Sequence, residues 1–252
     1  IFVRRFIYEQ TPDIVINVID SANIERSLFL TTQLIDMDLR IVAALNMYDE
    51  LERKKIEFDY DELSELMGLP FIPTISLKGI GLDKLTDKII EVFEGKDTVA
   101  RHIHINYGND IEESIRKIRL KIKEDKPITD KISSRFLAIK MLEKDSHVRE
   151  LLSQYPNFND IENTSKKEIR RIEALLDDNS ETVITDAKYG FIAGALKETF
   201  INPFRKEKTR SEKIDNIITH KYLGFPIFTA ILFLMFYATF NLGSYPMKWI
   251  DN

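Results

Sequence analysis

The chain has 252 residues, with 36 Lys and Arg against 41 Asp and Glu, which gives a formal net charge of −5. Hydrophobic residues at 44% and charged residues at 31% exclude a disordered or fibrous chain, and the acidic balance argues against a dedicated nucleic-acid binder, which usually carries a basic face. Because the chain has no cysteine, it has no disulfide, no cysteine-based zinc site and no thiol catalysis.

Residues 13–94 alternate short apolar runs with longer amphipathic ones. The β-branched run 14–19, which ends at Asp20, predicts a strand that is covered on both faces. A helical segment follows, and we expect Asn23 to cap it through its side-chain oxygen. Residues 40–45 predict a second buried strand.

The same alternation continues further along the chain. A helix is expected over 61–67, ending at Gly68, and a short strand over 70–74. The next helix carries an apolar stripe at helical spacing, formed by Leu82, Leu85, Ile89 and Phe93. Strands and helices that alternate at this spacing predict an α/β fold with a parallel sheet.

From about residue 101 to residue 216 the pattern becomes helical only. Apolar residues recur at intervals of three or four in four segments, which include Ile111, Phe136, Ile169 and Tyr189, and charged residues lie between them. This pattern predicts a compact all-α domain with charged outer faces.

Residues 223–242 contain no charged side chain. About 20 apolar residues in a helix cross the hydrocarbon core of a bilayer, so we predict a transmembrane helix at about 223–242, with a buried core helix as the alternative. Lys248 is the only basic residue in the sequence after this segment. Six basic residues lie shortly before it: Arg205, Lys206, Lys208, Arg210, Lys213 and Lys221. By the positive-inside rule, residues before about 222 are expected to be cytoplasmic.

A candidate ligand-binding loop follows the second predicted strand and reads Asn46-Met47-Tyr48-Asp49. Open α/β sheets bind ligands at the carboxyl ends of their strands. The carboxylate of Asp49 can accept from both the N1–H and the exocyclic amine of guanine, a donor pair that adenine lacks. Asn46 would brace the loop and donate toward the base or the neighbouring backbone. The alternative is a capping asparagine followed by a first-turn aspartate.

A second loop follows the third predicted strand and begins Thr74-Ile75-Ser76. In guanine-nucleotide-binding domains, a loop in this place offers a backbone N–H to the guanine oxygen; a plain turn is the alternative. Two such loops in this order favour a guanine site, with these candidate residues: Asn46, Met47, Asp49, Thr74, Ile75 and Ser76.

The runs 20–28, 31–34 and 46–49 strongly resemble the G domain of the ferrous iron transport protein B family. Residues 213–217 and 220–227 resemble that family's entry into its first transmembrane helix. This resemblance implies the C-terminal part of a P-loop-type G domain, an all-α helical domain and the start of a membrane domain. The expected boundaries are 1–97, 98–210 and 211–252.

The resemblance also implies roles for the candidate residues. Asn46 and Asp49 match the family's base-recognition motif, and Met47 stands where many other GTPases have lysine. Thr74 to Lys78 matches the fifth, base-contacting loop, which would close over the base, although Ile75 and Ser76 depart from its usual Ser-Ala pair.

No G-x-x-x-x-G-K-[ST] motif occurs in the sequence, and no D-x-x-G precedes the first strand. Family order places these motifs and the Mg²⁺ ligands upstream of Ile1, and the iron path beyond Asn252, so we expect this chain to be part of a longer protein. Phosphate positioning and Mg²⁺ supply most of the catalysis of GTP hydrolysis. We therefore expect a GTPase in the full-length protein and no hydrolysis by this chain alone.

The function implied by the resemblance is that of a GTP- or GDP-binding cytoplasmic portion of a transporter, which couples nucleotide state to Fe²⁺ uptake across the inner membrane. A small cytoplasmic accessory protein and a homo-oligomer are further implied partners. Two alternatives stay open: a membrane-tethered, non-catalytic helical scaffold or regulator, and a soluble GTPase of the ribosome-assembly type.

Overall fold

The structure is a computed structural model that describes residues 6–7, 12–124, 132–200 and 224–242. The chain divides into two compact units, Ile1–Pro203 and Phe204–Asn252. The first unit holds an α/β part and a helical part, and the second holds the helix α13 (Gly224–Leu242).

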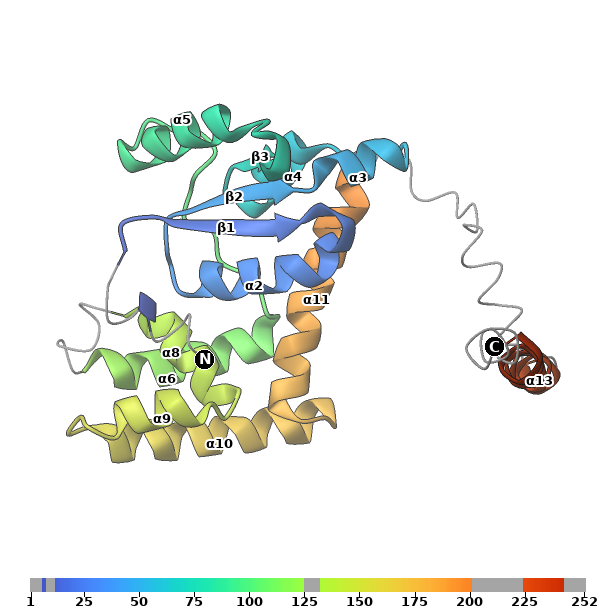
Figure 1. The fold of residues 1–252 in the computed structure, drawn as a ribbon. Helices are drawn as coiled ribbons and strands as arrows, with labels where there is room; N and C mark the ends of the chain where they lie inside the picture. The colour runs from blue at the N-terminus through green and yellow to red at the C-terminus, as the bar shows by residue number, and fades with distance from the viewer. Residues whose placement is uncertain (1–5, 8–11, 125–131, 201–223, 243–252) are drawn as a thin grey trace. The chain divides into compact units, whose positions relative to one another are not determined.

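Three parallel strands form the sheet of the first unit, in the order β1-β2-β3. They are β1 (Val15–Asp20), β2 (Ile41–Asn46) and β3 (Phe71–Pro73). The register pairs Asp20 with Asn46, so the carboxyl ends of β1 and β2 meet at one edge (Figure 1). Residues 41–45 are all buried, which confirms that the second apolar run is a core strand.

Helices cover both faces of this sheet, as expected for an α/β fold. One face carries α2 (Ile24–Asp36) and the other carries α5 (Leu82–Phe93) (Figure 1). Two shorter helices follow β2, namely α3 (Tyr48–Arg53) and α4 (Tyr60–Met67). As predicted, α4 ends at Gly68, and this glycine has the left-handed conformation.

The expectation that the first strand is covered on both faces is wrong for the described part of the chain. The side chains of Ile16 and Val18 are 48% and 64% exposed. The reason is that α5 packs over β2, so no described helix lies above the side chains of β1 that point to that face. On α5 itself, Ile90 and Phe93 are exposed and only Val92 is buried.

The predicted cap of α2 is also wrong. Asn23 occupies the N-cap position, but its side chain makes no cap hydrogen bond. Its Nδ2 donates instead to Asp20 Oδ2 at 2.8 Å, and Asp20 Oδ1 accepts from the backbone N of Ala22 at 2.9 Å. Asp20 therefore stabilises the 3-10 turn η1 (Ser21–Asn23), from which α2 continues.

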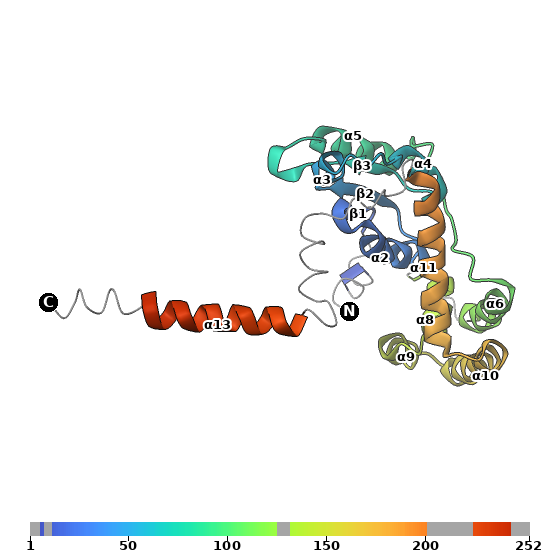
Figure 2. The same ribbon diagram turned by 90° about the vertical axis from the view of Figure 1, so that its right-hand side faces the viewer.

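The helical part contains five helices among the described residues: α6 (Asn109–Lys123), α8 (Ser134–Leu142), α9 (Ser146–Leu152), α10 (Phe158–Leu176) and α11 (Ser180–Thr199). The short α9 was not expected; the side chain of Asp145 caps it. Figure 2 shows α11 running from the helical part past α2 to α4. At its end, Thr199 O accepts from the backbone N of Asp59 at 2.9 Å, which ties the two parts together.

In the second unit, α13 carries no acidic or basic side chain in its first or last turn. No helix within the described residues has the length and hydropathy needed to cross a membrane. The predicted transmembrane helix at 223–242 is therefore not confirmed. The basic residues at 205–221 lie outside the described residues.

Candidate functional site at the carboxyl edge of the sheet

The first candidate loop turns the chain sharply from β2 into α3. Asn46 is the last residue of the strand, and Met47 has φ +58° and ψ +34°. This left-handed conformation is uncommon for a residue other than glycine, and such strain tends to occur at functional sites. The turn places Asp49 in the first turn of α3, at the same edge as Asn46.

The second candidate loop is fixed to the first by the backbone. Thr74 N donates to Leu45 O at 2.8 Å, and Tyr48 N donates to Thr74 O at 3.3 Å. Ile75 and Ile80 then form an antiparallel bridge around the 3-10 turn η2 (Ser76–Lys78). The two predicted loops thus lie side by side.

Side chains join the loops as well. Asn46 Oδ1 accepts from both the backbone N of Ser76 at 3.0 Å and its Oγ at 2.8 Å. The side chain of Asn46 therefore holds the second loop, and the backbone N–H of Ser76 is already engaged by it.

Sequence reasoning missed the partner of the key carboxylate. Lys78 Nζ lies 3.1 Å from Asp49 Oδ2, and the two side chains are 59% and 39% exposed. The signal that could have found this pair is a cation inside the second loop, two residues after Ser76. Asp49 is thus accessible to a ligand and paired with a lysine from the neighbouring loop.

Gly81 allows the second loop to close. Its φ is +80°, and a Cβ at this position would lie 2.2 Å from the backbone oxygen of Pro73. No side chain can be accommodated there without moving the backbone. Glycine is therefore needed here for the close approach of the loop's two ends.

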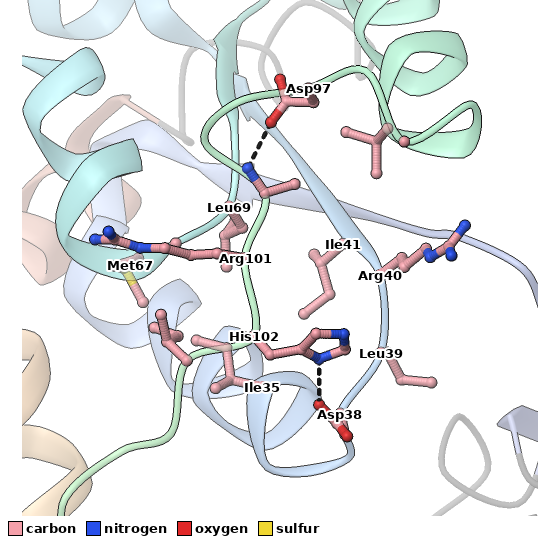
Figure 3. Close-up of a pocket in the computed structure, with 15 residues that line it drawn as sticks. Ile35, Asp38, Leu39, Arg40, Ile41, Met67, Leu69, Asp97, Arg101 and His102 are labelled. Carbon is pink, nitrogen blue, oxygen red and sulfur yellow. Dashed lines mark hydrogen bonds and ion pairs between the residues drawn. The ribbon is translucent and has the colours of Figure 1, made fainter.

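A cavity of about 220 Å³ lies beside the residues that precede β2 and the linker 97–103. In this cavity His102 Nδ1 lies 2.7 Å from Asp38 Oδ1, while the side chains of Arg40 and Arg101 extend away on opposite sides (Figure 3). The cavity therefore offers a ligand no converging pair of cations. The carboxyl edge of the sheet, with its accessible carboxylate, is the better candidate site.

A buried ionic cluster links the α/β part to the helical part. Lys188 Nζ lies 3.2 Å from Asp36 Oδ2 and 2.7 Å from Glu143 Oε1, and Lys188 is only 1% exposed. The hydroxyl of Tyr107 donates to Asp36, and Lys140 pairs with Glu143. The cluster therefore joins the end of α2 to α8, α11 and the segment before α6.

Burial governs the protonation of this cluster. It raises the pKa of the Asp36 carboxyl above its usual value, although Lys188 and Tyr107 oppose this. Burial also acts to raise the pKa of Glu143, but the ammonium groups of Lys188 and Lys140 outweigh it and lower that pKa. Burial and the neighbouring Asp36 carboxylate raise the pKa of Tyr107 far above its usual range, so Tyr107 stays a hydrogen-bond donor.

Two family models match most of the chain. Residues 1–89 match the model described as ferrous iron transport protein B, and residues 107–201 match the FeoB cytosolic helical domain. The chain is 42% identical over 254 residues to the Fe(2+) transport protein A/Fe(2+) transporter FeoB fusion protein of Porphyromonas gingivalis, which covers all of this chain and 30% of that protein.

A second curated relative is the Fe(2+) transporter FeoB of Staphylococcus aureus strain MSSA476, which is 30% identical over 93% of this chain and 34% of that protein. The chain thus spans about a third of the length of these relatives.

Solved structures agree with these matches. The mGMPPNP-bound NFeoB of S. thermophilus is 27% identical, with a TM-score of 0.69 over 80% of this chain and 73% of that one. NFeoB of the same organism bound to GDP.AlF4- and K+ is 28% identical, with a TM-score of 0.68 over 77% and 72%.

Proposed function

Because the chain belongs to the ferrous iron transport protein B family, we propose that it is the guanine-nucleotide-binding and helical portion of a ferrous iron transporter. The observation that most directly supports this proposal is that the two candidate loops, at 46–49 and 74–78, contact each other at one edge of the sheet. Asn46 binds both polar groups of Ser76, and Asp49 stands beside them with its carboxylate accessible.

In this proposal Asp49 accepts from the N1–H and the exocyclic amine of guanine, and Asn46 holds the second loop in place. Met47, Thr74, Ile75 and Ser76 form the rest of the base site. A carboxylate fits guanine, since it offers two acceptors to two adjacent donors. The phosphate cradle and the Mg²⁺ ligands would come from the remainder of the G domain.

The helical part would pass the nucleotide state on to the membrane part of the transporter, and so couple it to Fe²⁺ uptake across the inner membrane. Its buried cluster with α2 supports this role, because a rigid junction transmits a change at one end of a helix to the other. Coupling requires that GTP and GDP favour different conformations. We place the limits of the three parts at 1–97, 98–210 and 211–252, with the first two in the cytoplasm.

The decisive experiment titrates fluorescent GDP, fluorescent ADP and a fluorescent xanthine nucleotide against the full-length protein and its Asp49→Asn variant. We expect the parent protein to prefer GDP, and the variant to shift toward xanthine nucleotides, because the amide replaces an acceptor with a donor where xanthine has a carbonyl. Asp186→Asn, an exposed position on α11, is the matched control and should change neither affinity. Equal binding of GDP and ADP by the parent protein would favour a scaffold instead. Unchanged guanine preference in Asp49→Asn would remove Asp49 from the site.

A further inference from the structure

The base-reading carboxylate is occupied by a side chain of the protein itself. Lys78 Nζ lies 3.1 Å from Asp49 Oδ2, and Lys78 comes from the loop that is expected to close over the base. Met47, at the turn between Asn46 and Asp49, brings no charge. The cation beside Asp49 is therefore supplied by the opposite loop.

The backbone fixes the position of Lys78. Its N–H donates to Ile75 O at 2.9 Å, and the next residue, Gly79, has φ +67° and ends the η2 turn. An antiparallel backbone bridge between Ile75 and Ile80 closes the turn. The same turn leaves Leu77 fully exposed, so one side chain of this short turn faces Asp49 while its neighbour faces solvent.

Guanine and this ammonium group compete for the same atom. To read guanine, Asp49 must accept from two adjacent donors, one at each carboxylate oxygen. In the structure Oδ2 already accepts from Lys78, whereas the bonds from Asn46 to Ser76 use a different side chain. A base that pairs with both oxygens of Asp49 would meet Lys78 at Oδ2, whereas the bonds from Ser76 to Asn46 involve other atoms and can remain.

We propose that Lys78 is a positioning residue that pairs with Asp49 when no nucleotide is bound and is displaced by the guanine base, so that it lowers guanine-nucleotide affinity and slows association. This inference rests on the proposed function. An ion pair as exposed as this one shifts an equilibrium by at most about fivefold. The effect is therefore one of tuning, and it weakens with salt because exposed pairs are screened.

The test compares the full-length protein with its Lys78→Met variant, which keeps the stem length and removes the charge. Fluorescent GDP is the probe, and binding is followed by stopped flow and equilibrium titration at low and high NaCl. We expect Lys78→Met to associate faster and bind GDP about two- to fivefold more tightly at low salt, with the difference shrinking at high salt. Lys123→Met, at an exposed lysine on α6 in the helical part, is the matched control and should behave like the parent.

A second pair of variants separates competition for Asp49 from any other effect of the charge. In the Asp49→Asn background, Lys78 has no carboxylate to pair with. With a fluorescent xanthine nucleotide as the probe, Lys78→Met should therefore leave both the association rate and the affinity unchanged. Unchanged or weaker GDP binding by Lys78→Met, in a parent that prefers GDP to ADP, overturns the inference and leaves the proposed function standing. A parent with no preference for GDP instead removes the proposed function.

Discussion

We predict that Lys188→Met strongly destabilises the first unit. Lys188 is 1% exposed and lies between two carboxylates, 3.2 Å from Asp36 and 2.7 Å from Glu143. Methionine has a similar length and an apolar end, so the substitution removes a charge with little change in volume. Glu143 keeps Lys140 as a partner, but Asp36 keeps only the hydroxyl of Tyr107.

The magnitude follows from stranding a buried carboxylate. Removing one partner of a buried ion pair costs about 3–5 kcal/mol, because the remaining charge stays desolvated without compensation. Total stability is about 5–15 kcal/mol for a domain, so this loss should be visible as a large fall in the urea midpoint. Far-ultraviolet circular dichroism across a urea gradient measures it, with an unchanged slope as the check that the same transition is compared.

Two further measurements sharpen this prediction. Asp36→Asn in the Lys188→Met background removes the stranded charge and should recover part of the loss. Lower pH should also recover part of it, because burial already raises the pKa of Asp36 and loss of Lys188 raises it further. A group whose folded pKa lies above its unfolded value favours the folded state most when it is protonated, so the deficit should be larger at pH 8 than at pH 5. A cost below about 1 kcal/mol, or a deficit independent of pH, would refute the reasoning.

Two predictions concern other parts of the first unit. Gly81→Ala places a Cβ 2.2 Å from Pro73 O at a residue with φ +80°. We expect it to lower the free energy of unfolding by more than about 1 kcal/mol, measured by urea denaturation, and to weaken GDP binding, measured by titration. Gly95 also has a positive φ but open space around it, so Gly95→Ala should lower stability without changing GDP binding. Acid should destabilise the helical part through Glu168, where burial is outweighed by Arg171, Ser114 and Lys117, which lower its pKa. A carboxyl with a lowered pKa in the folded state contributes stability that is present above the ordinary value of 4.5 and is lost as the pH falls below it. Glu168→Gln should therefore reduce the fall in urea midpoint between about pH 5 and pH 3. The same dependence of the midpoint on pH in the variant and the parent would contradict this role.

The sequence predicted the elements whose signals are local. The continuous apolar run of β2, the stop of α4 at Gly68 and the short strand before Thr74 are each set by residues close together in the chain, and each agrees with the structure. That the two candidate loops lie side by side was also predictable, because the carboxyl ends of parallel strands share one edge.

The sequence could not predict pairs set by tertiary packing. The sequence shows Lys78 as a cation in the second loop, but its pairing with Asp49 depends on how the two loops pack. Lys188 meets Asp36 only because separate helices are packed together. No periodicity marks such a lysine: on α11 Lys188 occupies an ordinary helix position, and charged residues are seldom expected in a core. The exposed face of β1 was missed because a continuous β-branched run does not reveal how far the covering helix extends.

The same buried cluster gives α2 a place in the proposed coupling. One end of this helix follows the η1 turn, at the edge where Asp20 pairs in register with Asn46. The other end is Asp36, held by Lys188 and Tyr107. Thirteen residues at about 1.5 Å per residue span roughly 20 Å, so α2 connects the candidate base site to the helical part as a single rigid element. In the proposed function, movement of the base loops would pass along α2 to α8 and α11, because the buried cluster holds the end of α2 against these helices.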